Sequence, residues 1–312
     1  MIAVTYHGAG GPEVMSVDER PDPVPMSSEV LIRATHAGLN PADLVQRAGH
    51  YPAPPGSPAD IPGLEVAGTV IACGEGVTSW RAGDRVFGLV GGGGLSDTVA
   101  VHERHVTRIP DNLTDREAAA VPEAFITAHD AVFTRAGLAL GETLLVNGAS
   151  GGVGTAAVQL GVAAGARVLA NSRSHREALA ELGAEPCLLS EAHGVDVVLE
   201  LVGAANIPGS LEALAVRGRI IVVGTGAGAD AEVSLRAVMG KRASLMGTVL
   251  RARSMEDKAA AVQAFAHSVV PHLAAGRLRP VIDRVFPVAE AAAALDHLAA
   301  PGKLGKVLLE LG

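Results

Sequence analysis

Two hydrophobic patterns divide the chain. Up to about residue 119, short apolar or β-branched runs such as Val30–Ala34, Val66–Ile71 and Arg85–Val90 are separated by turn-forming clusters of Gly and Pro. From about residue 120, apolar runs of strand length alternate with helix-length segments, a pattern typical of a parallel sheet covered by helices. The sequence therefore predicts a β-rich first domain and an α/β second domain.

Five stronger strands are predicted in the second domain, and several of them are continuously apolar, as expected when both faces of a sheet are buried. The five are Thr143–Asn147, Arg167–Asn171, Val195–Leu201, Arg219–Gly224 and Ser244–Val249. A weaker strand at Cys187–Leu189 is separated from Val195 by only a handful of residues, whereas a parallel crossover normally takes a dozen or more. We therefore expect this third strand to be short and its following helix to be missing.

Four elements follow the second domain. They are a helix at 257–270, a strand at 281–286, a helix at 289–300 and a strand at 306–311. We expect the last strands to return to the first domain, which makes that domain discontinuous. The predicted ranges are 1–119 for the β-rich domain, 120–261 for the α/β domain and 262–312 for the returning segment.

Composition mainly excludes classes of protein. Hydrophobic residues make up 48% of the 312 residues and charged residues 19%, which indicates a globular chain. There is no apolar run long enough to cross a membrane and no signal-peptide pattern, so we expect a cytoplasmic protein. The formal net charge of −8 argues against nucleic acid or an anionic membrane as the main partner. Cys73 and Cys187 cannot form a disulfide framework, and we expect both to be buried apolar side chains.

A glycine-rich turn carries the strongest chemical signal. Gly148, Gly151 and Gly154 lie between the strand Thr143–Asn147 and a predicted helix at Thr155–Ala164. Glycine permits the tight turn, the approach of a pyrophosphate to the backbone, and close packing of helix on strand. The exposed N–H groups and the positive end of the helix dipole favour the anion. This strand–turn–helix context predicts a dinucleotide-binding site.

The end of the next strand indicates which dinucleotide binds. An NAD enzyme usually carries Asp or Glu there, about 20 residues after the turn. This chain has Ser172, Arg173 and Arg176 but no acid. A guanidinium can bind a 2′-phosphate through two hydrogen bonds, whereas an acid would repel it. We therefore expect NADPH; the alternative is a solvated loop in which Ser174 only caps a helix.

Four segments resemble the zinc-independent quinone oxidoreductase branch of the medium-chain dehydrogenase/reductase superfamily. They are Gly38–Asp43 with Arg47–Pro52, Pro62–Gly68, Ala120–Ala128 and Lys241–Arg253. Within the branch, the chain is most similar to the tumour-suppressor-induced quinone oxidoreductase group. The resemblance covers essentially the whole chain. It implies a GroES-like, partly open β-barrel catalytic domain, a Rossmann domain with a doubly wound parallel sheet, and a cleft between them for the nicotinamide.

The resemblance also implies a homodimer and a site without metal. The strand Ser244–Val249 is expected to pair with its copy in a partner, since it is an apolar edge that would otherwise be exposed. Zinc-dependent relatives place cysteine near position 40 and histidine near position 64, where this chain has Asn40 and Leu64. His102 and His105 lie in a strand-like run and are expected on opposite faces.

Site residues follow from the same resemblance. Those expected at the nicotinamide are Thr127, Gly224, Thr225, Val249 and Leu250; at the pyrophosphate, Ser150, Gly151, Gly152 and Val153; at the adenosine phosphate, Ser172, Arg173 and Arg176; and, as a further cofactor contact, Lys306. At the substrate, Asn40 is expected to donate to an oxygen that gains negative charge, and Tyr51 to donate a hydrogen bond or a proton. Each has a structural alternative, Asn40 as a turn residue before proline and Tyr51 as a packing residue in its loop.

The sequence thus predicts an NADPH-dependent quinone reductase that transfers hydride without zinc. One alternative is an enoyl or 2-alkenal reductase that acts on conjugated carbonyls or enoyl thioesters. Another is a non-catalytic nucleotide-binding protein, similar to the lens crystallin of this branch. The expected partners are a small-molecule quinone or conjugated carbonyl compound and a second copy of the chain.

Overall fold

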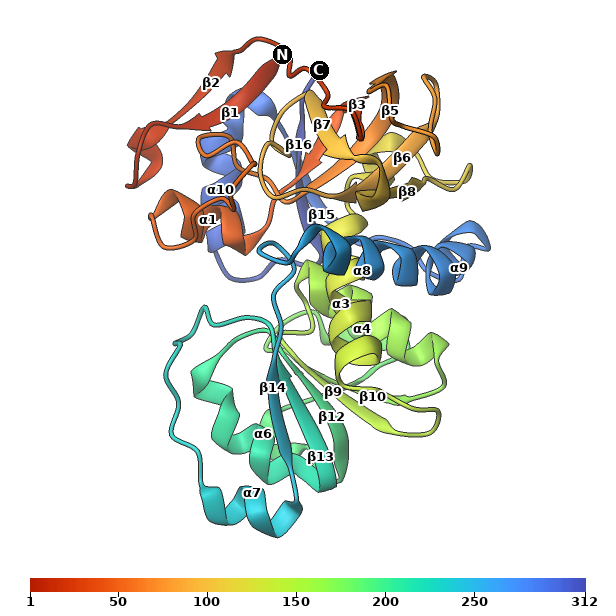
Figure 1. Ribbon diagram of the computed structural model, residues 1–312. Helices are drawn as coiled ribbons and strands as arrows, with labels where there is room; N and C mark the ends of the chain where they lie inside the picture. The colour runs from red at the N-terminus through yellow and green to blue at the C-terminus, as the bar shows by residue number, and fades with distance from the viewer. The chain divides into compact units, whose positions relative to one another are not determined.

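The computed structural model describes residues 1–312 and divides the chain into two compact units (Figure 1). Unit 1 comprises Met1–Ile126 and Leu250–Gly312, and unit 2 comprises Thr127–Val249. The first boundary lies inside helix α3 (Pro122–His129), and the second precedes helix α8 (Met255–Ser268). Helix α8 therefore belongs to unit 1, although the predicted α/β range includes its first half. No helix is both long enough and apolar enough to cross a lipid bilayer.

Unit 1 contains three small sheets. A five-stranded antiparallel sheet has the order β7-β3-β5-β6-β8, a three-stranded sheet has the order β15-β16-β4, and β1 pairs with β2. Their bounds are β1 Ile2–Tyr6, β2 Met15–Glu19, β3 Glu29–Arg33, β4 His36–Gly38, β5 Glu65–Cys73, β6 Arg85–Leu89, β7 Thr98–His102, β8 Val106–Arg108, β15 Ile282–Pro287 and β16 Lys306–Glu310. The antiparallel pairing of β16 with β4 confirms that the C-terminal strands return to the first domain.

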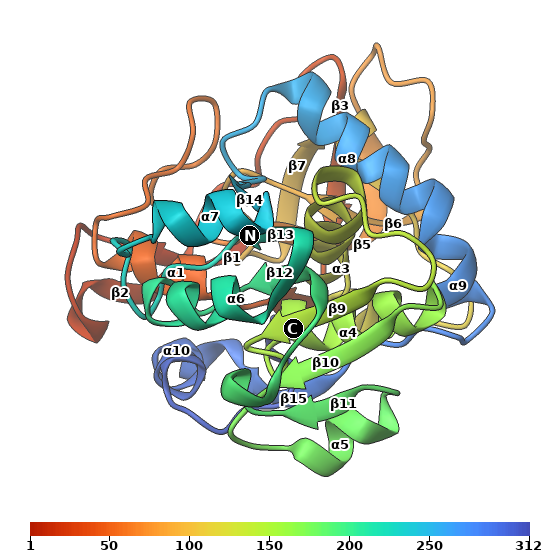
Figure 2. The same cartoon turned by 90° about the horizontal axis from the view of Figure 1, so that it is seen from below.

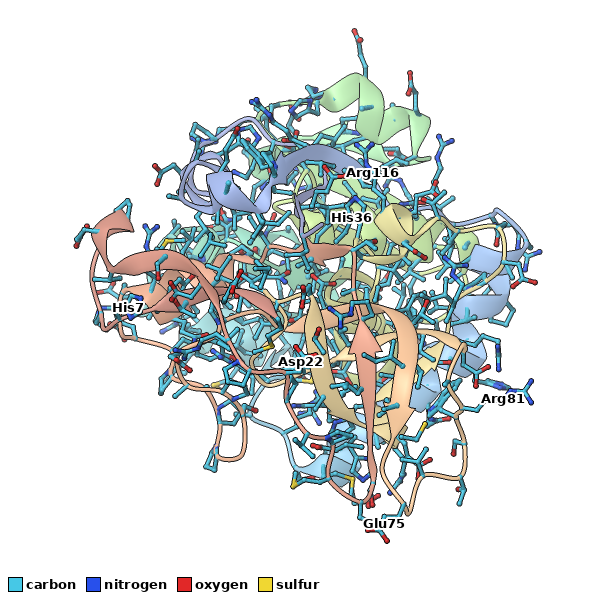
Figure 3. The ribbon with its side chains drawn as sticks, turned by 90° about the horizontal axis from the view of Figure 1, so that it is seen from above. His7, Asp22, His36, Glu75, Arg81 and Arg116 are labelled. Carbon is cyan, nitrogen blue, oxygen red and sulfur yellow. The ribbon has the colours of Figure 1, made fainter.

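Unit 1 contains five helices besides the first part of α3. They are α1 Pro41–Arg47, α2 Asp115–Ala118, α8 Met255–Ser268, α9 Val270–Ala274 and α10 Ala291–Ala299. Capping side chains precede α2 and α8. The hydroxyl of Ser254 accepts from the amide of Asp257 at 3.1 Å, so α8 starts earlier than the predicted residue 257. Asp22, labelled in Figure 3, accepts a hydrogen bond from the ammonium of Met1 through Oδ1 at 2.7 Å.

Unit 2 is built on a six-stranded parallel sheet with the order β11-β10-β9-β12-β13-β14, which can be followed in Figure 2. The strands are β9 Thr143–Asn147, β10 Arg167–Asn171, β11 Glu185–Cys187, β12 Val195–Glu200, β13 Leu214–Val222 and β14 Ser244–Gly247, and the helices are α4 Gly152–Ala163, α5 Arg176–Glu181, α6 Ile207–Ala213 and α7 Leu235–Lys241. After β11 the chain returns to the other side of β9 to form β12, so the strand order reverses at β9. This arrangement confirms the predicted doubly wound Rossmann sheet.

Alternate residues of each strand face opposite layers of unit 2. Leu145, Leu169, Val198 and Ile220 pack with α6 and α7 in one core cluster. Helix α4 and a π-helix at Asp130–Arg135 contact the sheet as well. Because both faces are covered, these strands carry apolar residues at consecutive positions.

The third strand of unit 2 has only the three residues Glu185–Cys187. A single 3-10 turn, Leu189–Glu191, is the only helical segment between it and β12. This confirms the expected short strand and missing helix. The two cysteines are unpaired; Cys73 is exposed and Cys187 partly buried, so the expected burial of Cys73 is wrong.

Candidate functional site

The glycine-rich turn of unit 2 has the geometry of a phosphate-binding bend. Gly148 has a φ of +84°, a conformation that side chains rarely adopt. A Cβ on Gly154 would lie 2.6 Å from the carbonyl oxygen of Ala149 and still closer to that of Gly148. At Gly151 the nearest atom to such a Cβ is 3.7 Å away, so this position is open. Helix α4 starts at Gly152 and directs its first amides at that open space.

The end of β10 carries no acid, and its side chains divide into two groups. Asn171 donates to Asn147 Oδ1 at 2.9 Å, and the buried Ser172 hydroxyl donates to the carbonyl of Ser174 at 2.9 Å, so both hold the local turn. Arg173 and Arg176 are exposed. Arg176 donates to the carbonyl of Pro186 at 2.8 Å, whereas Arg173 makes no side-chain bond within the protein. The role of Arg173 and Arg176 at a 2′-phosphate stays a prediction.

The residues expected at the nicotinamide are divided between the units. Gly224, the exposed Thr225, the largely buried Thr127 and the exposed Val249 belong to unit 2, and Leu250 to unit 1. A Cβ on Gly224 would overlap the carbonyl oxygen of Leu201, so this strand end tolerates only glycine. The roles of these residues at the cofactor stay predictions.

Unit 1 contains a buried ion pair. Lys306 Nζ donates to Glu65 Oε1 at 2.6 Å, to Asn40 Oδ1 at 2.6 Å and to the carbonyl of Leu39 at 2.9 Å. Lys306 is 5% exposed and Glu65 2%. All three ammonium hydrogens therefore have acceptors inside unit 1, which gives Lys306 a structural role; its expected contact with the cofactor stays a prediction.

Asn40 takes part in the same network. Its side-chain amide donates to Glu65 Oε1 at 2.8 Å and to the carbonyl of Gly38 at 3.4 Å. Its backbone amide donates to Asp43 Oδ2 at 2.7 Å at the start of α1. Both side-chain hydrogens have acceptors within the protein, which favours the alternative in which Asn40 is a turn residue. Its expected donation to a substrate oxygen stays a prediction.

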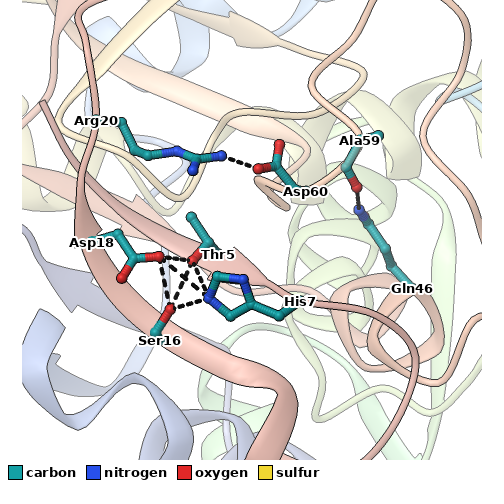
Figure 4. A network of polar contacts seen from close by, with 8 residues as sticks. All are labelled: Thr5, His7, Ser16, Asp18, Arg20, Gln46, Ala59 and Asp60. Atoms are coloured by element: carbon teal, nitrogen blue, oxygen red, sulfur yellow. Dashed lines mark hydrogen bonds and ion pairs between the residues drawn. The ribbon is translucent and has the colours of Figure 1, made fainter.

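Tyr51 lies in a loop that Arg251 holds in place. The guanidinium of Arg251 lies 4.9 Å from the centre of the Tyr51 ring and donates to the Tyr51 carbonyl at 2.8 Å. It also donates to the carbonyl of Gly91 at 2.8 Å and to Gln46 Oε1 at 2.6 Å. The amide of Gln46 in turn donates to the carbonyl of Ala59 at 3.3 Å, as Figure 4 shows. Hydrogen bonds therefore fix the loop that contains Tyr51 both at Tyr51 and at Ala59.

The Tyr51 phenol is suited to donate rather than to ionise. Burial, with the negative charge of Glu123, raises the pKa of Tyr51, and Arg251 opposes this only in part. The hydroxyl makes no hydrogen bond within the protein, and the side chain is partly exposed. At neutral pH it therefore offers a proton-bearing donor to a bound molecule.

Glu123 gives unit 1 a distinctive pH dependence. Burial, and then the neighbouring carboxylate of Glu65, raise the pKa of Glu123 from 4.5 to about 8. The folded chain therefore holds a proton that the unfolded chain releases, so stability falls as pH rises through this window and is fully present only below it. We expect the urea midpoint to drop as pH rises from about 4.5 to about 8 and to level off above that. The effect of Glu123 is best measured in the upper part of this range, from about pH 6.5 to about pH 8. This interval lies above the pKa of Asp43, which burial raises to about 6.

The matched variant for this prediction is Glu123→Gln, which keeps the shape of the side chain but cannot ionise. Its urea midpoint should change much less over the same interval. An unchanged pH dependence in Glu123→Gln would assign the effect to another group.

A second cluster, on the β1–β2 hairpin, brings together Thr5, His7, Ser16 and Asp18 (Figure 4). Ser16 Oγ lies 2.6 Å from His7 Nε2 and donates to Asp18 Oδ2 at 2.7 Å. Asp18 approaches the same ring nitrogen at 3.4 Å. In a hydrolytic triad the acid and the serine bind different ring nitrogens of the histidine, whereas here both approach Nε2 of His7. This cluster therefore stabilises the β1–β2 hairpin and does not activate Ser16.

The histidines do not form a metal site. His102 ends β7, and His105 follows in a 3-10 turn, which brings their rings to 5.4 Å; the expected opposite orientation is wrong because the strand ends at His102. His105 Nε2 bonds to the carbonyl of Met255 at 3.0 Å. No group of three or more His, Cys, Asp or Glu residues is placed to hold a metal ion.

Sequence reasoning missed the roles of Arg251 and Lys306. The signal for an internal cation was Glu65, an acid at the start of the otherwise largely apolar strand β5. Its partner lies 241 residues away, so spacing alone could not identify it. Arg251 lies shortly after β14, which ends at Gly247. No feature of the neighbouring sequence predicts that its side chain is buried.

Comparison with known proteins agrees with this architecture. Residues 26–111 match the alcohol dehydrogenase GroES-like domain, and residues 149–309 match the zinc-binding dehydrogenase family. The chain is 33% identical to quinone oxidoreductase of Rattus norvegicus, over 100% of this chain and 98% of the relative.

Several solved structures match this chain over its whole length, and two of them illustrate the range. An alcohol dehydrogenase superfamily protein from Novosphingobium aromaticivorans has a TM-score of 0.88 at 30% identity, with 100% of its own chain covered. The CurK enoyl reductase has a TM-score of 0.87 at 27% identity, with 99% of its chain covered. From the full-length identity, the matched domains and the Rossmann sheet, the chain belongs to the quinone oxidoreductase family of the medium-chain dehydrogenase/reductase superfamily.

Proposed function

We propose that this oxidoreductase is a zinc-independent NADPH:quinone reductase. The observation that carries the proposal is the bend Gly148–Gly154, which leaves Gly151 open in front of the α4 N-terminus and is followed by Arg173 rather than an acid. A nicotinamide cofactor fits this bend, and when bound it supplies hydride. The amides of Gly152 and Val153 bind its pyrophosphate, and Ser150 and the glycines leave room for it.

The choice of NADPH over NADH rests on Arg173. A guanidinium without an internal partner can form two hydrogen bonds with a 2′-phosphate. We expect Arg173→Ala to raise the KM for NADPH by about tenfold or more and to leave that for NADH within about twofold, since a charged hydrogen bond contributes about 1.5–3 kcal/mol.

The matched control for Arg173→Ala is Arg167→Ala, which removes a surface arginine paired with Glu185 on the same strand–loop segment. It should change neither constant. Equal effects of Arg173→Ala on the two cofactors would contradict the phosphate assignment.

The donors of unit 1 do not suit zinc. Position 40 holds an amide and position 64 an apolar side chain, and the carboxylate of Glu65 already binds the ammonium of Lys306. A zinc ion would have to compete with that cation for one carboxylate, without thiolate or imidazole ligands. We therefore assign no reaction step to a metal.

Tyr51 is the proposed donor to the substrate. Reduction of a quinone to a hydroquinone adds one hydride, supplied by the nicotinamide cofactor, and one proton. A side chain that donates this proton regains one from water. The neutral phenol of Tyr51 can hydrogen-bond the oxygen that gains charge and supply that proton. Arg251 fixes the loop on which the phenol is carried.

The second candidate function is enoyl or alkenal reduction, which the similarity to the CurK enoyl reductase supports. NADPH loss at 340 nm should be followed with ortho-quinones, para-quinones, enals and enoyl thioesters as separate acceptors. Turnover of quinones supports the first proposal, and turnover of thioesters alone replaces it with the second. NADPH binding without turnover of any acceptor would favour a crystallin-like, non-catalytic role.

We further propose a homodimer formed through β14. This strand is an edge of the six-stranded sheet, and Leu245 is 51% exposed. Exposed Leu235 and Met239 on α7 extend the apolar surface beside it. A second copy that pairs at this edge would cover both.

The dimer is tested by Leu245→Lys, which places a charge on the edge strand. We expect sedimentation velocity to show a dimer for the native chain and a monomer for the variant. Val216→Lys, a substitution at another exposed apolar residue of unit 2, is the control and should stay dimeric. A monomeric native chain contradicts the proposal.

A further inference from the structure

Glu200, at the end of β12, is a buried acid whose partners all lie at the carboxyl edge of the sheet. Its side chain is 0% exposed. Oε1 accepts from the amides of Val202 at 2.7 Å and Gly203 at 2.9 Å, and from the side chain of Asn206 at 3.3 Å. Oε2 accepts from Asn147 Nδ2 at 2.6 Å. None of these partners carries a charge, so the group is held by amides alone.

Through Asn147, this carboxyl group reaches the strand that leads into the phosphate-binding bend. Asn147 is the last residue of β9 and directly precedes Gly148. Its own side-chain oxygen accepts from Asn171 at the end of β10, at 2.9 Å. A continuous chain of side-chain hydrogen bonds thus joins the ends of β10, β9 and β12, across the point where the strand order reverses.

The turn at 201–203, whose amides donate to the Glu200 carboxylate, contacts the loop that is expected to bind the nicotinamide. A Cβ on Gly203 would lie 2.7 Å from the carbonyl of Gly228 and 2.9 Å from Cα of Thr225. The backbone carbonyl of Glu200 also accepts from Gly224 at 3.1 Å. On its other side, the turn touches the bend, because a Cβ on Gly148 would lie 3.2 Å from Val202 Cγ2. The turn therefore lies between the two loops.

We propose that Glu200 is a positioning residue that sets both halves of the dinucleotide site, the bend at Gly148 and the loop at Thr225, in one arrangement before the cofactor binds. This inference rests on the proposed binding of a nicotinamide dinucleotide to unit 2. Such preorganisation raises affinity because the loops need not be ordered when the ligand arrives. It also couples the two halves, since one side chain holds both.

The test is Glu200→Gln, which keeps the size of the side chain but replaces one acceptor oxygen with a donor. The new NH2 group must face either Asn147 or the amides of the turn, and the facing donors lose their acceptor. Binding is measured with two half-ligands, 2′,5′-ADP and reduced nicotinamide mononucleotide, each titrated into the full chain. We expect both to bind about tenfold or more weakly, because hydrogen bonds to a buried acid are among the stronger ones.

Two control variants separate positioning from other effects. Asn206→Ala removes only the longest bond to Glu200 and should weaken either half-ligand by less than about threefold. Arg173→Ala should weaken 2′,5′-ADP alone. Thermal unfolding identifies variants that do not fold; if Glu200→Gln is one of them, Glu200→Asp, which is too short to reach both partner groups, is measured in its place.

Weakening of both half-ligands in the folded Glu200 variant supports the proposal. Weakening of only one, or of neither, overturns it while the proposed function stands. If the native chain itself binds neither NADPH nor NADH, the proposed function fails, which is a different outcome.

Discussion

Replacing Lys306 with Met is expected to lower the free energy of unfolding by about 3–5 kcal/mol, because it leaves the buried carboxylate of Glu65 without its cation. The ammonium is the only charged partner of Glu65 and makes three hydrogen bonds of 2.6–2.9 Å. It also joins β16 to the β4–α1 connection, so its loss should loosen the C-terminal strand. Urea unfolding followed by circular dichroism measures the change.

Two controls locate that effect. The double variant Lys306→Met with Glu65→Gln removes both charges and should recover a large part of the lost stability, since a neutral pair has a smaller desolvation cost. Arg167→Met breaks the Arg167–Glu185 pair, whose side chains are 54% and 56% exposed, and should cost less than about 1 kcal/mol. A Lys306→Met variant as stable as the native chain would show that the ion pair contributes nothing.

Replacing Gly154 with Ala is expected to cost both stability and cofactor binding. The added Cβ would lie 2.6 Å from the carbonyl oxygen of Ala149, and closer to that of Gly148, and both are backbone atoms that cannot turn aside. Helix α4 must therefore move away from the bend. We expect a loss of about 1–3 kcal/mol in unfolding free energy, and a Kd for NADPH raised by at least about tenfold.

Gly151→Ala is the matched variant, because its Cβ would meet nothing closer than 3.7 Å and its φ of −74° suits any residue. Its stability should stay within about 0.5 kcal/mol of the native chain. Its affinity for NADPH should nevertheless fall, since the methyl group occupies the space that a pyrophosphate needs. Native affinity in Gly151→Ala would mean that no phosphate approaches the bend there.

The fold could be predicted largely from local pattern. Strands β9 and β10 begin and end at the predicted residues because glycine turns and buried apolar runs mark them. The missing helix after β11 followed from chain length alone. Strand β13 starts earlier than predicted, at Leu214, because Leu214 pairs with Val195 across a register shift that precedes the pair of Val197 with Arg219.

Only those parts of the candidate site that depend on residues close together in the sequence could be predicted. Gly148 and Gly154 act through their own backbone surroundings, so a motif identifies them. Asn40 and Lys306 were assigned to substrate and cofactor because their motif carries such residues in relatives. Their partners within the protein are set by the pairing of β16 with β4, which brings residue 306 beside residue 40. A contact between residues so far apart in the chain depends on the tertiary structure.

The most direct test of the account is an NMR titration of the full chain with NADPH. The backbone amide signals of Gly151, Gly152 and Val153 should shift and saturate together at one cofactor per chain, with NADH requiring a higher concentration. Saturable binding that leaves these three amides unchanged would contradict the central claim that the dinucleotide lies on the Gly148–Gly154 bend.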